Sequence, residues 1–95
     1  MPGTTTSSSV FFYAYVLLSL KDGEKYIGYT PDLKRRMEEH RQGRTFSTSY
    51  RLPVKLIYYE ACLSEIDAKR RERYFKSTGG RRFLAKRLRN YFTKL

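Results

Sequence analysis

Five side chains in this sequence have the chemistry needed to hydrolyse a phosphodiester bond: Tyr15, Tyr26, Arg36, His40 and Glu72. Hydrolysis requires a base for the attacking water, positive charge beside the phosphoryl oxygens and help for the departing oxygen. Tyrosine or histidine can supply the base, and arginine can bind phosphate through two parallel hydrogen bonds. One carboxylate, with water and substrate oxygens, can hold Mg²⁺. The five residue types therefore suit metal-assisted phosphodiester cleavage.

Each of these residues also has an ordinary structural explanation. A tyrosine in a strand usually contributes packing, and a histidine beside an apolar stripe is more often a hydrogen-bonded structural residue. Arg36 could be an ion-pair partner, for example of Glu72, and Glu72 could pair with a basic residue of its own helix. Composition and spacing alone thus predict a basic nucleic-acid binder with a candidate site.

A strand, a turn and a helix are expected to position three of the five residues. Residues 25–29 are typical of a strand, and Thr30 followed by Pro31 is typical of an N-cap and a first helical residue. The helix is predicted to run to about Arg41, with Gly43 as its stop signal.

The spacing within this helix indicates where its polar side chains point. At about 100° per residue, Leu33, Arg36, Met37 and His40 fall within one arc. We therefore expect Arg36 and His40 to flank the stripe that faces the sheet.

The preceding residues predict a β-hairpin. Residues 10–19 are apolar on both faces, which indicates a central strand, and Asp22-Gly23 provides a tight reversal into residues 25–29. Alternation along the two strands directs Tyr15 to one face of the first strand and Tyr26 to one face of its partner.

The rest of the chain predicts one more strand and two helices. Residues 54–61 form the strand, Ser64 caps a helix that carries Glu72, and Gly79-Gly80 ends or hinges that helix. Residues 84–95 form a final amphipathic helix. The predicted order β-β-α-β-α-α is that of a small α+β domain spanning residues 10–95, after a disordered tail at residues 1–9.

The charge of the chain is strongly positive and unevenly distributed. The net charge is +11, and residues 68–95 contain eleven Lys and Arg but one acid, Glu72. Such asymmetry indicates a polyanionic partner, most simply a nucleic acid, although a solubilising basic face would look similar. The residues expected to contact the backbone of DNA are Lys69, Arg70, Arg73, Lys76, Arg81, Arg82, Lys86 and Arg87.

Cysteine content and hydropathy limit the other possibilities. The single cysteine, Cys62, excludes an internal disulfide and argues against structural zinc, so a cytoplasmic, intracellular setting is expected. No run approaches the roughly 18–20 apolar residues that span a bilayer, so no membrane partner is expected.

Taken together, these motifs resemble the GIY-YIG nuclease family over roughly residues 11–92. Tyr26-Ile27-Gly28 matches the second signature of the family, Arg36 follows its tyrosine by ten residues, and His40 follows four residues later. Residues 55–60 and 64–72 resemble the later part of the short, single-domain members. In those members the acid that corresponds to Glu72 binds the metal.

The first signature of the family is only partly present. Tyr13-Ala14-Tyr15 stands where the family has Gly-Ile-Tyr, so only Tyr15 is carried over.

The resemblance implies a three-stranded antiparallel sheet flanked by helices, and a DNA endonuclease that uses Mg²⁺ or Mn²⁺ and no small-molecule cofactor. Branched or damaged DNA is the implied substrate. Tyr15 and Tyr26 would flank the scissile phosphate, one of them orienting or deprotonating water. Arg36 would stabilise the developing charge, His40 would relay or position a proton, and Glu72 would hold the metal.

The resemblance also gives Gly28 a steric role, because a side chain there would obstruct the backbone and the substrate beside Tyr26. A second hypothesis is a non-catalytic nucleic-acid-binding module that retains the nuclease fold. The sequence does not set the oligomeric state.

Overall fold

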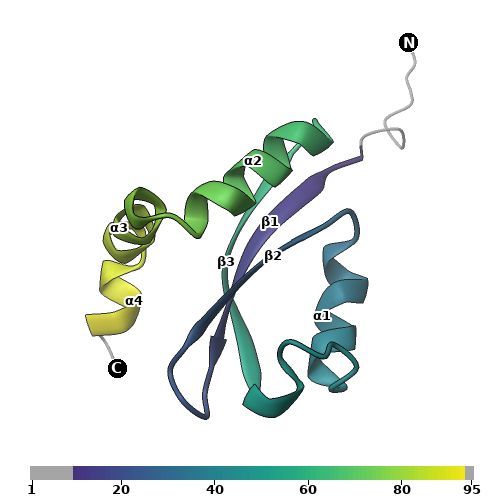
Figure 1. Cartoon of the computed structure of the whole chain (residues 1–95), viewed down its shortest axis with the longest axis vertical. Coiled ribbons are helices and arrows are strands. Elements are labelled where there is room, and N and C mark those ends of the chain that lie inside the picture. The colour runs from purple at the N-terminus through teal and green to yellow at the C-terminus, as the bar shows by residue number, and fades with distance from the viewer. Residues whose placement is uncertain (1–9, 94–95) are drawn as a thin grey trace.

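The most apolar stretch of the chain forms the central strand of a three-stranded antiparallel sheet (Figure 1). In the computed structural model, which describes residues 10–93, β1 spans Phe12–Ser19, β2 spans Lys25–Thr30 and β3 spans Val54–Cys62. The strand order is β2-β1-β3, so β1 is covered on both edges and both faces, as its two-sided apolar pattern predicts. The tail expected at residues 1–9 lies outside the described residues.

Helices cover both faces of this sheet (Figure 1). Helix α1, Leu33–Arg41, lies on one face, and the other face carries α2, Glu65–Phe75, α3, Thr78–Arg87, and α4, Arg89–Thr93. The predicted α+β architecture and three-stranded antiparallel sheet are confirmed. Among residues 10–93, no helix combines the length and the apolar character that crossing a bilayer requires.

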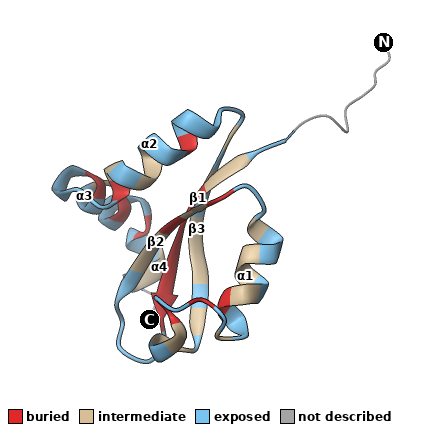
Figure 2. Cartoon of the chain, turned by 45° about the vertical axis from the view of Figure 1, so that its right-hand side comes forward, coloured by how far each residue is buried: buried red, intermediate tan, exposed pale blue. Residues whose placement is uncertain are grey.

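Successive residues of β1 enter two different layers. Ala14 and Val16 are fully buried and pack with Phe75 of α2 and Leu84 of α3, whereas Tyr15 contacts His40 of α1. Figure 2 shows the buried residues concentrated on β1 and on the inner sides of the helices. The alternation of a strand therefore separates the apolar core from the face that carries Tyr15.

Helix α1 begins later than predicted, because Thr30 is not its N-cap. The Thr30 hydroxyl accepts a hydrogen bond from the Asp32 backbone N–H at 3.1 Å, so it is already used in the turn. Asp32 is the cap, and its carboxylate accepts from the Arg35 backbone N–H at 3.2 Å. The predicted end is confirmed: the helix stops at Arg41, and Gly43 follows with a φ of 75°.

The two adjacent glycines neither end nor hinge α2, which already ends at Phe75. They lie in the first turn of α3, where Ser77 is the N-cap and accepts from the Gly80 N–H at 3.1 Å. A Cβ atom at Gly80 would lie 1.8 Å from the Tyr74 carbonyl oxygen. Glycine is therefore required here, because the start of α3 approaches the backbone of α2 closely.

The predicted single C-terminal helix is also wrong, since the chain breaks between α3 and α4 at the buried Leu88. This break returns the chain toward the sheet, where the Lys25 ammonium lies 5.0 Å from the Phe92 ring centroid. The Lys55 ammonium lies 5.5 Å from the Tyr91 ring centroid. These cation–π contacts require a turn that one straight helix does not provide.

Candidate active site

Tyr15 reaches across the edge strand β2 because the residue opposite it is glycine. Tyr15 pairs with Gly28 in the sheet register, and a Cβ atom at Gly28 would lie 2.4 Å from both Cζ and the hydroxyl oxygen of Tyr15. The protein group that a side chain here would meet is Tyr15, and obstruction of a substrate beside Tyr26 stays a prediction. The ring itself is 1% exposed.

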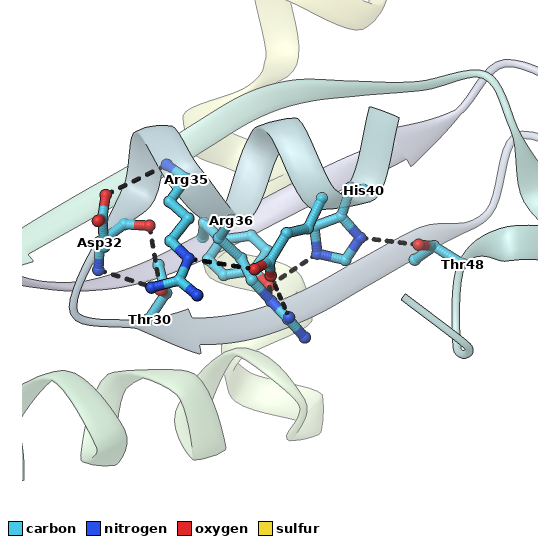
Figure 3. Close-up of polar contacts among 8 residues, drawn as sticks. Thr30, Asp32, Arg35, Arg36, His40 and Thr48 are labelled. Carbon is cyan, nitrogen blue, oxygen red and sulfur yellow. Dashed lines mark hydrogen bonds and ion pairs between the residues drawn. The ribbon is translucent and has the colours of Figure 1, made fainter. Parts of the chain in front are cut away.

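The Tyr15 hydroxyl belongs to a chain of hydrogen bonds that runs from α1 into the following loop. The Arg36 Nε–H donates to the Tyr15 hydroxyl oxygen at 3.4 Å, and this oxygen lies 2.9 Å from His40 Nε2. On the other side of the imidazole, His40 Nδ1 lies 2.7 Å from the Thr48 hydroxyl (Figure 3). The predicted orientation of Arg36 and His40 toward the sheet is confirmed.

Tyr15 and His40, at the centre of this chain of hydrogen bonds, are both uncharged at neutral pH. Burial lowers the pKa of His40 to about 4, and the Arg36 charge acts in the same direction, against an opposing effect of Glu39. Burial raises the pKa of Tyr15, and the hydrogen bond from Arg36 partly offsets this effect. Tyr15 therefore carries its proton, and His40 is a neutral hydrogen-bonding group.

The low pKa of His40 predicts that the stability of the protein depends on pH. The folded pKa of about 4 is below the ordinary value of 6.5, so the unfolded chain takes up a proton that the folded chain does not. The stabilisation is complete above pH 6.5 and is lost as the pH falls toward 4. We expect the free energy of unfolding to decrease by about 2 kcal/mol between pH 7 and pH 5.

Because His40 is the only histidine, its NMR titration is unambiguous. The Cε1 proton is expected to titrate near pH 4 and to remain unchanged between pH 6 and pH 8. In a His40→Gln variant, the decrease in stability between pH 7 and pH 5 should be largely absent. A midpoint near 6.5 would contradict the neutral, buried assignment.

Arg36 is held by an acid of its own helix. Its Nη1 lies 2.8 Å from Glu39 Oε1, and the side chain of Arg36 is 34% exposed. The alternative that Arg36 pairs with Glu72 is therefore wrong. A solvent-accessible ion pair of this kind contributes little stability, so an incoming phosphate can compete with Glu39 for the guanidinium.

Tyr26 lies beside Tyr15 and His40 and lines a cleft. Its ring centroid is 5.5 Å from that of His40 and 6.4 Å from that of Tyr15. The cleft has a volume of about 550 Å³, and its lining includes Tyr26, Lys76 and Arg81. A second hollow of about 280 Å³ is lined by the end of β2 and the start of α1, with Arg36 among its residues. The first hollow is lined by residues of α2 and α3 as well as β2, and the second by residues of α1 as well as β2.

Glu72 extends from α2, and its charge contributes to the raised pKa of Tyr15. Its carboxylate lies 3.0 Å from the Lys76 ammonium, which confirms that it has a basic partner in its own helix. The side chain of Glu72 is 23% exposed. Residues 10–93 contain no group of three or more His, Cys, Asp or Glu arranged to hold a metal ion.

The donor set around Glu72 nevertheless fits one kind of metal site. Mg²⁺ keeps several waters and is commonly held by one or two carboxylates together with substrate phosphate oxygens. Glu72 is connected to the cleft through its ion pair with Lys76, and Glu24 is a second carboxylate in the lining of the cleft. One such carboxylate matches this requirement, because the substrate itself would supply the other oxygens.

The eight basic residues predicted to contact DNA are all exposed on α2, its C-cap and α3. Lys76 and Arg81 line the cleft beside Tyr26. Lys69 and Arg70 form ion pairs with acids of the same helix, and Arg87 stacks over Phe83. Arg73, Arg82 and Lys86 are the remaining members of the set.

Arg71, which precedes Glu72, has a structural role. Its Nε and Nη2 donate to the two carboxylate oxygens of Glu60 at 2.8 and 3.1 Å, and its guanidinium stacks on Tyr74 and Phe75.

Sequence reasoning missed Thr48, which is fully buried and binds His40. The stretch from Arg44 to Leu52 reads as a polar loop, and its only signal is its Ser and Thr content. Nothing in the spacing indicates that one of these hydroxyls turns inward to the imidazole.

Comparison with known proteins gives a consistent result. Residues 11–86 match the profile of the GIY-YIG catalytic domain. A UPF0213 protein of Streptococcus agalactiae is 49% identical over 65 residues, which cover 67% of this chain and 73% of the relative. A UPF0213 protein of Bacillus licheniformis is 39% identical over 71 residues, which cover 74% and 70%. No solved structure matches the chain.

Proposed function

This chain belongs to the GIY-YIG catalytic-domain family, and from this premise we propose that it is a metal-dependent DNA endonuclease that hydrolyses phosphodiester bonds. The family indicates a nuclease-type domain and a nucleic-acid substrate. The observation that carries the proposal is the buried chain of hydrogen bonds Arg36–Tyr15–His40–Thr48, whose arginine also lines the hollow at the end of β2.

In the proposed reaction, a water oxygen forms a bond to phosphorus while an ester P–O bond breaks. The Tyr15 oxygen accepts a proton from this water, as its own proton passes to His40 Nε2 at 2.9 Å. This direction requires the imidazole tautomer with a proton on Nδ1, which donates to Thr48. Thr48 is thus a positioning residue that holds the ring with its free lone pair toward Tyr15.

Arg36 supports this step in two ways. Its hydrogen bond to the Tyr15 oxygen favours the phenolate, and its guanidinium can bind a phosphoryl oxygen once it exchanges Glu39 for the substrate. Tyr26, beside both rings, is proposed to orient the water or the scissile phosphate.

Glu72 is the residue proposed to hold Mg²⁺ or Mn²⁺, with substrate oxygens completing the set. When bound, such an ion stabilises negative charge on the phosphoryl and departing oxygens. Lys76 would release Glu72 at small cost, because an exposed ion pair within a helix contributes only a few tenths of a kcal/mol.

The DNA backbone is proposed to follow β2 and the basic surface of α2 and α3. Lys76 and Arg81 would contact phosphates within the cleft, and Lys69, Arg70, Arg73, Arg82, Lys86 and Arg87 those beyond it. Branched or damaged DNA is the proposed substrate, with a cytoplasmic setting. The observation that supports the alternative, a binding module without catalysis, is the altered Tyr13-Ala14-Tyr15 strand.

The test is incubation of the protein with Mg²⁺ or Mn²⁺ and a panel of linear, nicked, flapped and branched DNA. We expect Arg36→Ala and Glu72→Ala each to reduce the cleavage rate by about 10²-fold or more, because each removes charge at the phosphate. Glu65→Ala is the matched control, since Glu65 is an exposed acid of α2 that also pairs with a lysine four residues later.

Undiminished cleavage by Glu72→Ala would overturn the metal assignment. Salt-sensitive binding of DNA with no cleavage of any substrate would support the binding module instead.

A further inference from the structure

Two aromatic rings project from the loop that follows α1. Phe46 is 78% exposed and Tyr50 is 68% exposed, and their rings form an edge-to-face pair with centroids 5.8 Å apart. Single exposed apolar residues are common and require no explanation. A contacting pair that leaves both rings largely in water is different, because it presents two adjacent π-faces for a ligand.

The backbone beneath the pair is anchored at several points. The Lys21 ammonium donates to the Tyr50 carbonyl oxygen at 3.1 Å, and the Ser19 hydroxyl donates to the Arg51 carbonyl oxygen at 2.8 Å. The Ser49 hydroxyl donates to the Phe46 carbonyl oxygen at 3.0 Å. The backbone that carries the rings is therefore anchored before binding, which lowers the conformational entropy lost when a ligand binds.

This loop is also connected to the candidate active site. Thr48, midway between the two aromatic residues, turns inward and binds His40 Nδ1 at 2.7 Å. Phe46 and Tyr50 therefore flank Thr48, which is the end of the hydrogen-bonded chain Arg36–Tyr15–His40–Thr48.

The charges around the pair identify the class of ligand. The loop residues 42–53 contain Arg44 and Arg51 and no acidic residue. The Lys21 ammonium, which donates to the Tyr50 carbonyl oxygen, adds a further positive charge. Aromatic rings among cations are the combination by which proteins bind single-stranded nucleic acid: the rings stack on bases, and the cations contact phosphates. The bases of an intact duplex are stacked on one another, so only an unpaired segment offers free base faces.

We propose that Phe46 and Tyr50 form a stacking platform for unpaired bases next to the scissile phosphate, so that the substrate is DNA with a single-stranded segment. This inference rests on the proposed endonuclease function for its place beside a scissile bond. The stacking itself does not depend on cleavage.

The test compares binding of one labelled oligonucleotide as a 20-nucleotide single strand and as a duplex, by fluorescence anisotropy in EDTA at fixed salt. Each stacked base contributes about 1–3 kcal/mol, so Phe46→Ala/Tyr50→Ala should weaken single-strand binding by at least about tenfold. Duplex binding should change by less than about twofold, because the basic residues remain. The matched control is Phe11→Ala/Tyr59→Ala, which removes two rings that are 40% and 50% exposed elsewhere.

A second variant separates stacking from folding. Phe46→Leu/Tyr50→Leu keeps the apolar volume but removes the π-faces, and it should show the same selective loss. Quenching of 2-aminopurine in the single strand should disappear in both variants and persist in Tyr50→Phe. Unchanged single-strand binding, an equal loss for duplex, or dissociation of a dimer by these substitutions would each overturn the platform.

These results are distinguishable from a failure of the proposed function. Selective loss of single-strand binding in a protein that cleaves no DNA would leave the platform standing and remove the endonuclease. Normal cleavage of flapped DNA by Phe46→Ala/Tyr50→Ala would leave the endonuclease standing and remove the platform.

Discussion

A Tyr15→Phe variant is expected to cleave DNA about 10²–10⁴-fold more slowly than the wild type while keeping the same fold. The change deletes one oxygen, which accepts from Arg36 and lies 2.9 Å from His40 Nε2. Without this oxygen the proposed proton transfer has no acceptor next to the water. Binding of DNA should be retained, because the basic residues of α2 and α3 are unchanged.

The same variant should be slightly less stable. His40 Nε2 loses its partner inside a fully buried environment, at a cost of about 1–3 kcal/mol. Thermal unfolding measures this decrease, and cleavage is then compared at a temperature where both proteins are folded.

Tyr13→Phe is the matched control for this experiment. Tyr13 lies two residues earlier on β1, half-buried, and its ring packs edge-to-face on Tyr59. Cleavage by Tyr13→Phe should be near that of the wild type. Equal losses in the two variants, or no loss in Tyr15→Phe, would remove Tyr15 from the proposed mechanism.

Local patterns were sufficient to predict most of the fold. The two-sided apolar pattern of residues 10–19 indicates the central strand, and the helical arc of Arg36 and His40 indicates their orientation toward the sheet. These features depend on residues near one another in the sequence. The cap of α1 was misassigned because Thr30 and Asp32 are both good N-cap residues, and the backbone of the turn decides between them.

Features that depend on distant contacts were not predictable. Gly79 and Gly80 suggest a helix end in any sequence, but here both lie inside α3, and the close approach of α3 to the Tyr74 carbonyl requires glycine at position 80. Thr48 is one of several hydroxyl residues in a polar loop, and only the folded loop brings it to His40. The partner of Arg36 is Glu39, three residues later in α1, and not Glu72 of α2.

The low pKa of His40 changes the chemistry that the sequence alone suggests. A histidine with an ordinary pKa could act alone as a base near neutral pH. Here burial lowers its pKa to about 4, so the imidazole is a weaker base, and in the proposed reaction the proton it accepts is the one that Tyr15 passes to it. The proposed proton transfer therefore requires the contact between Tyr15 and His40, and the missing side chain of Gly28 leaves room for the Tyr15 ring that makes it.

Gly28→Ala is expected to destabilise the protein by about 1–3 kcal/mol and to reduce cleavage about as strongly as Tyr15→Phe. The added methyl group would lie 2.4 Å from Cζ and the hydroxyl oxygen of Tyr15. The ring has little room to move, because it is 1% exposed and packs against His40 and Tyr26. Relief of the overlap must therefore shift Tyr15 away from His40.

A double-mutant cycle with Tyr15→Leu tests this cause directly. Leucine retains apolar volume near the strand but lacks the ring atoms that lie over Gly28. In this background Gly28→Ala should be neutral or stabilising by up to about 1 kcal/mol, because alanine restricts the unfolded chain more than glycine does. The sign of the stability change thus reverses between the two backgrounds, as measured by urea unfolding. In Gly28→Ala alone, the His40 resonance should titrate above pH 4, since displacement of Tyr15 admits water to the imidazole. A similar destabilisation in both backgrounds would show that Gly28 is required by the strand itself and not by Tyr15.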